Sequence, residues 1–256
     1  MYFKKYKKFT WLGASMKEQH IIEKNTYWDD LDAHLESLLK VGYVKLPSID
    51  QFDLPNLAKN ISSDMGSSTF AELGKSHESF LKNLGVEEVL APKLFDLARE
   101  FFDYKGKLSN QYHIARRVEP GNSKEMYRAH FDSHLFTMVL PIKIPQSIQG
   151  DSAGELIYFP QARPAPKGEI TNIIGKAYHK RFATKEGIKV FAKRHKQMIE
   201  DFRDHCPLIF IGNTTLHTNR MVSQTCSSYR LTLLAHFFDP SPKFGVGGLM
   251  RLIRGR

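Results

Sequence analysis

Two histidines and one aspartate are the residues of this sequence whose types and spacing are best suited to holding a metal ion. His130 and Asp132 are separated by one residue, so on a strand their side chains would point to the same side. His217 follows an apolar run at 208–211 and a turn. Two imidazoles and one carboxylate are the ligand set of non-haem iron(II) sites, which keeps coordination positions open for other molecules. These three residues are therefore our candidate metal ligands and catalytic residues.

An arginine near the start of the last apolar strand is a candidate for binding an anion. Arg230 and Thr232 alternate along that strand, so they share one of its faces. A guanidinium group can bind a carboxylate through two parallel hydrogen bonds, and a neighbouring hydroxyl can add a third. Burial of Arg230 without an anion would be unfavourable. The alternative role for Arg230 is an ordinary ion pair at the surface.

Residues 111–239 resemble the iron(II)/2-oxoglutarate-dependent dioxygenases, and above all their prolyl-hydroxylase-like branch. The motifs that carry the likeness are, in chain order, RVEPGN at 117–122, Tyr127 ahead of HFD at 130–132, TMVLP at 137–141, AGELIYFP at 153–160, His217 and Arg230. No single motif is specific, but their common order is hard to obtain by chance. The long segment 161–206 is more similar to the phytanoyl-CoA-hydroxylase type.

Two positions depart from the prolyl-hydroxylase pattern. Glu119 stands directly before the Pro-Gly turn, where many members carry a tyrosine that helps to bind 2-oxoglutarate. Tyr127 is our candidate for that role. Arg230 stands where the collagen-type enzymes use lysine. Prolyl specificity does not follow from the family likeness, so a peptidyl (prolyl-type) hydroxylase is an alternative to an enzyme that acts on small molecules.

The resemblance implies a fold, cofactors and a reaction. The expected fold is mainly β with flanking helices (α+β), built on a double-stranded β-helix, or jelly roll, with the metal at its open mouth. The candidate ligands would hold iron(II), and Arg230, Thr232 and Tyr127 would hold the cosubstrate 2-oxoglutarate. With dioxygen, such an enzyme hydroxylates its substrate. For His134 a pocket-lining role and a plain structural role both stay open, and we interpret His236 as structural.

The spacing of apolar residues and turn signals predicts the organisation of the chain. We expect one domain over residues 1–256, with a helical support at 1–110 outside the larger sheet, a jelly-roll core at 111–240 and a basic tail at 241–256. Predicted helices cover 28–40, a segment from Asp53, 92–104 and 185–203. Predicted strands cover 43–47, 112–118, 128–141, 156–159, 208–211 and 229–238. A basic insertion at 161–206 interrupts the core.

Positive charge is the main clue to partners. The formal net charge is +10, and segment 161–206 holds eleven lysines and arginines against five acidic residues. This insertion is either a solvated cover for the barrel or a lid that attracts an anionic substrate. The basic tail also carries apolar residues and could rest on an anionic membrane. We do not expect nucleic acid as a partner, because no zinc-finger, helix-turn-helix or aromatic RNA-binding pattern is present.

Other features narrow the class of protein. No apolar run reaches the length of a membrane helix, and we see no secretory leader pattern. Two cysteines, Cys206 and Cys226, do not make a disulfide framework, so we expect a cytoplasmic protein. Two alternatives stay open beside the dioxygenase: a zinc or cupin-type metalloenzyme with the same three ligands on the same barrel, and a binding module without catalytic activity.

Overall fold

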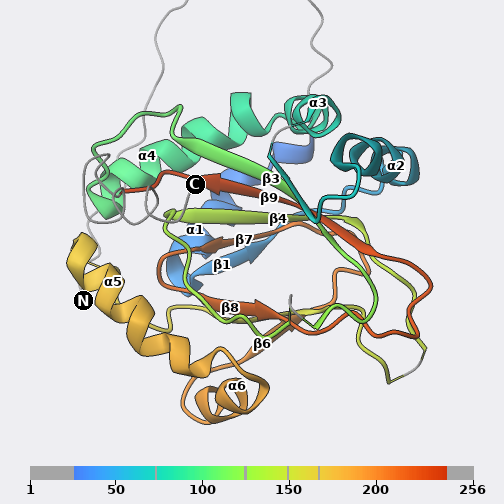
Figure 1. Cartoon of the computed structure of the whole chain (residues 1–256). Coiled ribbons are helices and arrows are strands. Elements are labelled where there is room, and N and C mark those ends of the chain that lie inside the picture. The colour runs from blue at the N-terminus through green and yellow to red at the C-terminus, as the bar shows by residue number, and fades with distance from the viewer. Residues whose placement is uncertain (1–25, 73, 124–125, 149, 167, 241–256) are drawn as a thin grey trace, which may run out of the picture.

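The protein is built around two antiparallel sheets, as a computed structural model that describes residues 26–240 apart from 73, 124–125, 149 and 167 shows (Figure 1). The strands are β1 (Tyr43–Lys45), β2 (Phe70–Glu72), β3 (Gln111–Val118), β4 (Phe136–Lys143), β5 (Leu156–Phe159), β6 (Met198–Glu200), β7 (Leu208–Ile211), β8 (Leu216–Asn219) and β9 (Arg230–Phe237). The major sheet has the order β1-β7-β4-β9-β3-β2, and the minor sheet has the order β6-β5-β8. The predicted basic tail, 241–256, lies outside the described residues.

The chain winds back and forth between the two sheets. After β4 in the major sheet come β5 and β6 in the minor, β7 in the major, β8 in the minor and β9 in the major. Apolar side chains from both sheets meet in the interior, among them Val139 and Phe210 from the major sheet and Leu156 and Tyr158 from the minor. This is the winding of a double-stranded β-helix. The α+β fold with a jelly-roll core, expected from the sequence, is confirmed.

Helices from the first part of the chain cover the outer face of the major sheet (Figure 1). They are η1 (Thr26–Trp28), α1 (Leu31–Val41), α2 (Leu54–Met65), α3 (Lys75–Leu84), the π-helical turn η2 (Val86–Leu90) and α4 (Ala91–Phe102). The basic insertion adds α5 (Glu169–His179), η4 (Lys180–Phe182) and α6 (Lys185–Ala192). None of the described helices combines the length and the apolar character needed to cross a membrane.

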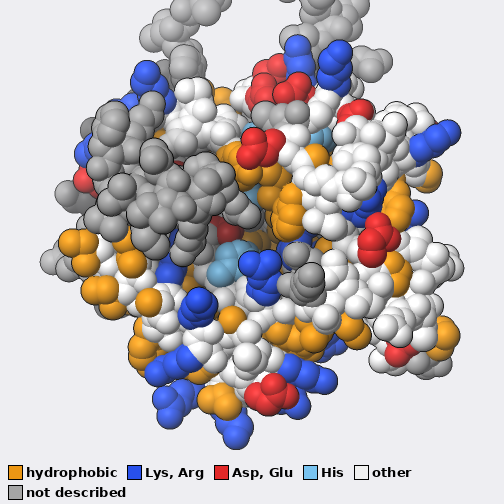
Figure 2. Space-filling view, viewed as in Figure 1, with side chains coloured by type: hydrophobic (Ala, Val, Ile, Leu, Met, Phe, Trp, Pro, Cys, Tyr) orange, Lys and Arg blue, Asp and Glu red, His pale blue; other side chains and the backbone are white. Residues whose placement is uncertain are grey.

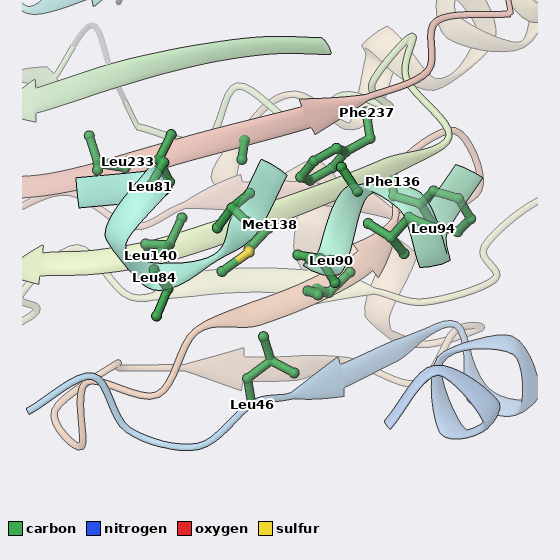
Figure 3. Close-up of a cluster of buried hydrophobic side chains, with 14 of the residues drawn as sticks. Leu46, Leu81, Leu84, Leu90, Leu94, Phe136, Met138, Leu140, Leu233 and Phe237 are labelled. Carbon is green, nitrogen blue, oxygen red and sulfur yellow. The ribbon is translucent and has the colours of Figure 1, made fainter. Parts of the chain in front are cut away.

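Alternation along the strands separates this helix-covered core from the interior between the sheets. Figure 3 shows side chains of β4 and β9 that point to the helices: Phe136, Met138, Leu140, Leu233 and Phe237, packed with Leu84, Leu90 and Leu94. The intervening residues of the same strands must therefore face the minor sheet. These inward positions are the ones available to build a site.

Local capping signals set several helix boundaries. Asp53 precedes α2, and its side chain accepts a hydrogen bond from the backbone N–H of Asn56. Gly42 ends α1 with a φ of +86°, and its N–H donates to the carbonyl of Leu38. A side chain at that φ would be strained, which explains the glycine. The predicted helices at 28–40, from Asp53 and at 92–104 correspond to α1, α2 and α4.

The strand predicted over 128–141 is wrong in its first half. β4 begins only at Phe136. His130 pairs with His217 in the minor sheet, whereas the N–H of Leu135 donates to the carbonyl of Phe238 at the end of the major sheet. Because the chain crosses from one sheet to the other between these points, residues 131–135 cannot belong to a single ladder.

The helix predicted over 185–203 is too long. α6 ends at Ala192, and residues 198–200 form β6. β6 pairs with β5, with Leu156 opposite Glu200 and Tyr158 opposite Met198. Helical periodicity could not reveal that this edge of β5 needs a backbone partner. α3, α5, β2 and β8 were not predicted as separate elements.

Protonation of His113 gives the fold a testable pH dependence. This residue of β3 is buried beside Phe237, and burial, with His236 and His77 nearby, lowers its pKa to about 4. An unfolded histidine titrates near pH 6.5, so stability is lost as the pH falls from 6.5 towards 4. We expect His113 to account for roughly 1–2 kcal/mol of the difference in unfolding free energy between pH 7.5 and pH 5.0. In His113→Phe, the change in unfolding free energy between pH 7.5 and pH 5.0, measured by urea unfolding, should be smaller by that amount. An unchanged pH dependence would show that His113 does not cause it.

Candidate metal centre

His130, Asp132 and His217 lie together, with His130 exposed and the other two buried. Their ligand atoms are all within 4.8 Å of one another. His130 Nε2 is 3.5 Å from Asp132 Oδ1, and His217 Nε2 is 3.7 Å from Asp132 Oδ2. Figure 2 shows pale-blue histidine and red acidic side chains side by side near the middle of this face. Two nitrogen donors and one oxygen donor at this spacing could surround one metal ion.

Backbone contacts fix the orientation of both histidines. His130 and His217 form an isolated antiparallel bridge, in which each N–H donates to the other residue's carbonyl. Nδ1 of His130 is 2.7 Å from the carbonyl oxygen of Arg128, and Nδ1 of His217 is 3.2 Å from that of Thr215. A carbonyl contact requires the proton to sit on Nδ1. The Nε2 lone pairs that face Asp132 are then available to a metal ion.

Asp132 is buried between the sheets, and hydrogen bonds hold both its carboxylate and its backbone. Thr137 Oγ1 donates to Asp132 Oδ2 at 2.6 Å, and the N–H of Asp132 donates to the carbonyl of Gly212 at 3.1 Å. A Cβ on residue 212 would lie 2.8 Å from Thr137 Oγ1 and 2.9 Å from the carbonyl oxygen of His134. Glycine at this position therefore gives the room in which Asp132 reaches the interior.

The cluster holds the protonation states that bind a cation. Burial lowers the pKa of His217 to about 4, so its imidazole is neutral near pH 7. Burial alone would raise the pKa of Asp132, but the neighbouring His217, His130 and His236 hold it well below its usual range. A neutral imidazole and an ionised carboxylate are the forms that coordinate a metal ion.

His236 joins this cluster from β9, although we interpreted it from the sequence as structural. Its Nε2 lies 3.9 Å from Asp132 Oδ2, and its ring centroid is 5.0 Å from that of His134. Arg230, Thr232 and His236 are separated by even numbers of residues, so all three face the interior. This alternation was the signal that could have revealed His236. His236 lies beside Asp132, and its ring contact with His134 brings that residue close to the candidate ligands.

Arg230 lies deeper in the interior, on the same face of β9. It is 3% exposed, and its Nη1 donates to Asn219 Oδ1 at 3.1 Å. Burial, and then the charge of Arg116, lowers the pKa of Arg230 to about 9, while Glu155 opposes this shift. Among the described residues no carboxylate lies within ion-pair distance of Arg230. The guanidinium is thus a buried positive group whose hydrogen-bond partner is a neutral amide.

Thr232 and Asn219 complete this polar strip. Thr232 is buried two residues after Arg230, and it pairs with Arg116 of β3. Asn219 follows His217 by two residues on β8, so both side chains face the interior. Asn219 therefore bonds to Arg230 and faces the same interior as His217. Nothing in the sequence singled out Asn219, because β8 had not been recognised as a strand.

Tyr127, predicted to help bind the cosubstrate, lies on the opposite side of the minor sheet. Its ring packs against an apolar cluster that includes Phe131 and Ile157. Its N–H donates to the carbonyl of Asn219 at the sheet edge, with a φ of +50°. Because side chains alternate across a sheet, this register turns Tyr127 away from the interior that holds Arg230. The structure does not bring Tyr127 to the site.

Comparison with known proteins finds likeness among solved structures only. No protein-family model matches the sequence, and no curated protein matches it. The prolyl 4-hydroxylase from Pseudomonas putida is 12% identical with a TM-score of 0.48, covering 82% of this chain and 98% of that chain. SnoN, a non-haem α-ketoglutarate-dependent epimerase from nogalamycin biosynthesis, is 12% identical with a TM-score of 0.48, covering 86% and 88%. The carbocyclase SnoK, from the same biosynthesis, is 11% identical with a TM-score of 0.46, covering 93% of each chain. These are likenesses of fold at low sequence identity.

Gly212 gives a test of how the candidate centre is built. In Gly212→Ala the new methyl group would collide with Thr137 and with the backbone of His134, so the crossing that carries Asp132 must shift. We expect a loss of roughly 1–3 kcal/mol in unfolding free energy, measured by urea unfolding without added metal. Gly168→Ala is the matched control, because a Cβ there has nothing within 4 Å and no positive φ. Equal stabilities of the two variants would show that Gly212 is not under this constraint.

Proposed function

We propose that this protein is an iron(II)- and 2-oxoglutarate-dependent dioxygenase that hydroxylates an anionic small molecule or a lipid- or sugar-linked one. The proposal depends on one observation: a cluster of metal donors and a buried arginine face the same space between the two sheets. His130, Asp132 and His217 form a cluster of metal donors. Arg230 is buried beside Asn219, two residues along β8 from His217.

The donor set fits iron(II). Two imidazole nitrogens and one carboxylate on one side of an ion keep its remaining positions free for a cosubstrate and dioxygen. When bound, iron(II) would let dioxygen, the oxidant, oxidise both 2-oxoglutarate and the substrate. The residues of this chain supply geometry: the carbonyls of Arg128 and Thr215 orient the two imidazoles, and Thr137 fixes the carboxylate of Asp132.

The buried Arg230 is suited to the far carboxylate of 2-oxoglutarate. A guanidinium without a carboxylate partner is costly to bury, and a dicarboxylate would compensate its charge. The hydroxyl of Thr232, on the same face of β9, is available as a further donor. Arg116 lies across from Thr232 and adds positive charge to this part of the interior. The polar strip therefore favours a ligand with one end at the metal and an anionic group at the other.

An anionic substrate is supported by basic groups beside the mouth of the site. Lys176 of α5 donates from Nζ to Ser133 Oγ at 2.8 Å, next in the chain to Asp132. Arg163 lies with its guanidinium carbon 4.0 Å from the Phe131 ring centroid and donates to the carbonyl of Asn213. Both belong to the basic insertion 161–206. We propose that this insertion acts as a lid that attracts the substrate, with a plain cover for the barrel as the alternative.

Two other enzyme classes would use the same cluster. A zinc or cupin-type metalloenzyme needs the three ligands but has no use for the buried Arg230 and Thr232, which is why we favour the dioxygenase. A peptidyl (prolyl-type) hydroxylase would need the three ligands as well as Arg230 and Thr232, and it would differ from our proposal only in its substrate. The described cysteines, Cys206 and Cys226, are free, which suits the reducing cytoplasm that we propose as its location.

Removal of each ligand tests the metal site. We expect His130→Ala, Asp132→Ala and His217→Ala each to weaken iron(II) binding by more than the roughly 10–100-fold that loss of a supporting group costs. Anaerobic titration calorimetry would measure binding, and release of succinate from 2-oxoglutarate would measure activity. His205→Ala is the control, because that histidine contacts Asp50 at the surface. A ligand variant with normal iron affinity would remove that residue from the site.

Arg230 tests the cosubstrate assignment separately. Arg230→Ala should weaken 2-oxoglutarate binding by about 10- to 150-fold, since a charge-assisted pair is worth roughly 1.5–3 kcal/mol. Arg230→Lys should restore part of the affinity, because lysine carries the charge without the planar fork. Iron(II) affinity should change little in either variant. Unchanged 2-oxoglutarate affinity in Arg230→Ala, with the exposed Arg203→Ala as control, would refute the assignment and favour a zinc or cupin-type enzyme.

A further inference from the structure

Helix α5 has its polar and apolar faces the wrong way round for a helix of a globular protein. Such a helix normally turns its apolar stripe to the core and its polar side to solvent. In α5 the residues that face the protein are Asn172, Lys176 and His179, which recur at helical spacing and are half-buried. The residues that face solvent are mostly apolar. This reversal calls for an explanation.

Specific contacts hold the polar face of α5 against the body of the protein. Asn172 Oδ1 accepts a hydrogen bond from Arg163, and Lys176 Nζ donates to Ser133. The ring of His179 packs edge-on against Phe131, with centroids 4.9 Å apart. These contacts set the rotation of the helix about its axis. The apolar face cannot turn inward without breaking all of them.

The opposite face of α5 exposes four large side chains. Ile170 is 67% exposed, Ile174 63%, Tyr178 55% and Ile173 38%. Positions 170, 174 and 178 are four residues apart and 173 lies beside them, so they form one continuous stripe. Figure 2 shows hydrophobic side chains gathered where Figure 1 places α5. A contiguous exposed apolar patch marks an interaction surface more often than isolated apolar residues do.

Positive charge borders this stripe. Residues 169–196, counted from the start of α5, contain eight lysines and arginines and two acidic residues, Glu169 and Glu186. Among the exposed ones, Lys180 and Arg181 follow directly after α5, and Lys185 and Lys189 lie on α6. The guanidinium carbon of Arg181 lies 3.6 Å from the centroid of the Tyr178 ring. Figure 2 shows basic side chains at the lower edge of the molecule, next to the apolar patch.

We propose that α5, with the basic residues of η4 and α6, docks on an anionic membrane surface. Isoleucine and tyrosine side chains would enter the boundary between headgroups and acyl chains, and the basic side chains would bind anionic headgroups. Each contribution alone is weak, but together they make a reversible attachment. The polar face of α5 lies beside Ser133, so docking would bring the mouth of the candidate site close to the lipid surface. The proposal stands independently of the reaction that the site performs.

Vesicle binding of the full-length protein tests the proposal. We expect it to sediment with vesicles of phosphatidylcholine and phosphatidylglycerol, and much less with phosphatidylcholine alone. Ile170→Ser with Ile174→Ser should lower the partition coefficient by about tenfold or more, since two buried isoleucine side chains are lost from the membrane. Lys180→Gln with Arg181→Gln should lower it too, and 0.5 M salt should lower it for the wild type because salt screens headgroup attraction.

Matched variants elsewhere keep the test specific. Val41→Ser with Phe101→Ser removes exposed apolar groups from α1 and α4, and Lys59→Gln with Lys82→Gln removes exposed charges from α2 and α3. Both should bind vesicles as the wild type does, and circular dichroism should show all variants folded. Leu252→Ser with Ile253→Ser tests the basic tail as a rival anchor.

Three results would overturn the proposal. The first is a wild type that ignores anionic vesicles. The second is a double isoleucine variant that binds as well as the wild type while the tail variant does not bind. The third is a wild type that forms dimers by light scattering, with the isoleucine variant monomeric and neither bound to vesicles, because the patch would then be a contact between two copies of this chain.

Discussion

A carboxylate buried between the two sheets is the constraint on which the rest of the site depends. Asp132 is 8% exposed, and a buried charge is tolerated only where hydrogen bonds and opposite charges compensate it. Three separate segments hold this residue. Thr137 at the start of β4 donates to the carboxylate, and His217 on β8 lies 3.7 Å from it. The backbone N–H of Asp132 donates to the carbonyl of Gly212 after β7. Contacts at several points therefore fix residues 131–135, where the chain crosses from the minor to the major sheet. Because the helices bury the other face of β4, this strand cannot rotate to expose Asp132.

The interior of the sandwich is divided between packing and binding. One part is filled by apolar side chains from both sheets, such as Val139 and Tyr158. Another part is a polar strip that runs from His217 through Asn219 to Arg230. The donors at one end are neutral or negative, and the group at the other end is positive. A ligand that bridges metal and arginine would complete both ends, and this is the physical basis of our proposal that a 2-oxoglutarate-like dicarboxylate binds there.

The mouth of the site and the outer surface are connected through one helix. Lys176 and Ile174 lie on opposite faces of α5, so the contact that directs a basic side chain toward Ser133 also directs isoleucines outward. An ordinary amphipathic helix would satisfy its apolar residues in the core and leave the mouth bare. Here the polar groups beside the mouth and the apolar patch outside have one common cause, which is the rotation of α5 fixed by Asn172 and Lys176.

The sequence by itself determined the residue types and the local patterns. Apolar periodicity and capping residues located α1, α2 and α4. Short β-rich runs between turn signals located β3, β5, β7 and β9. Both kinds of signal act between neighbours in the chain. The spacing of His130 and Asp132 also identified the candidate ligands. Only the tertiary structure decided what distant segments do to one another. Because His130 pairs with His217, the predicted strand begins only at Phe136. Pairing with the edge of β5 makes part of a predicted helix into β6. Sheet register directs Tyr127 outward and brings His236 and Asn219 inward. Each of these depends on backbone pairing between residues far apart in sequence, and local propensity carries no information about such pairing.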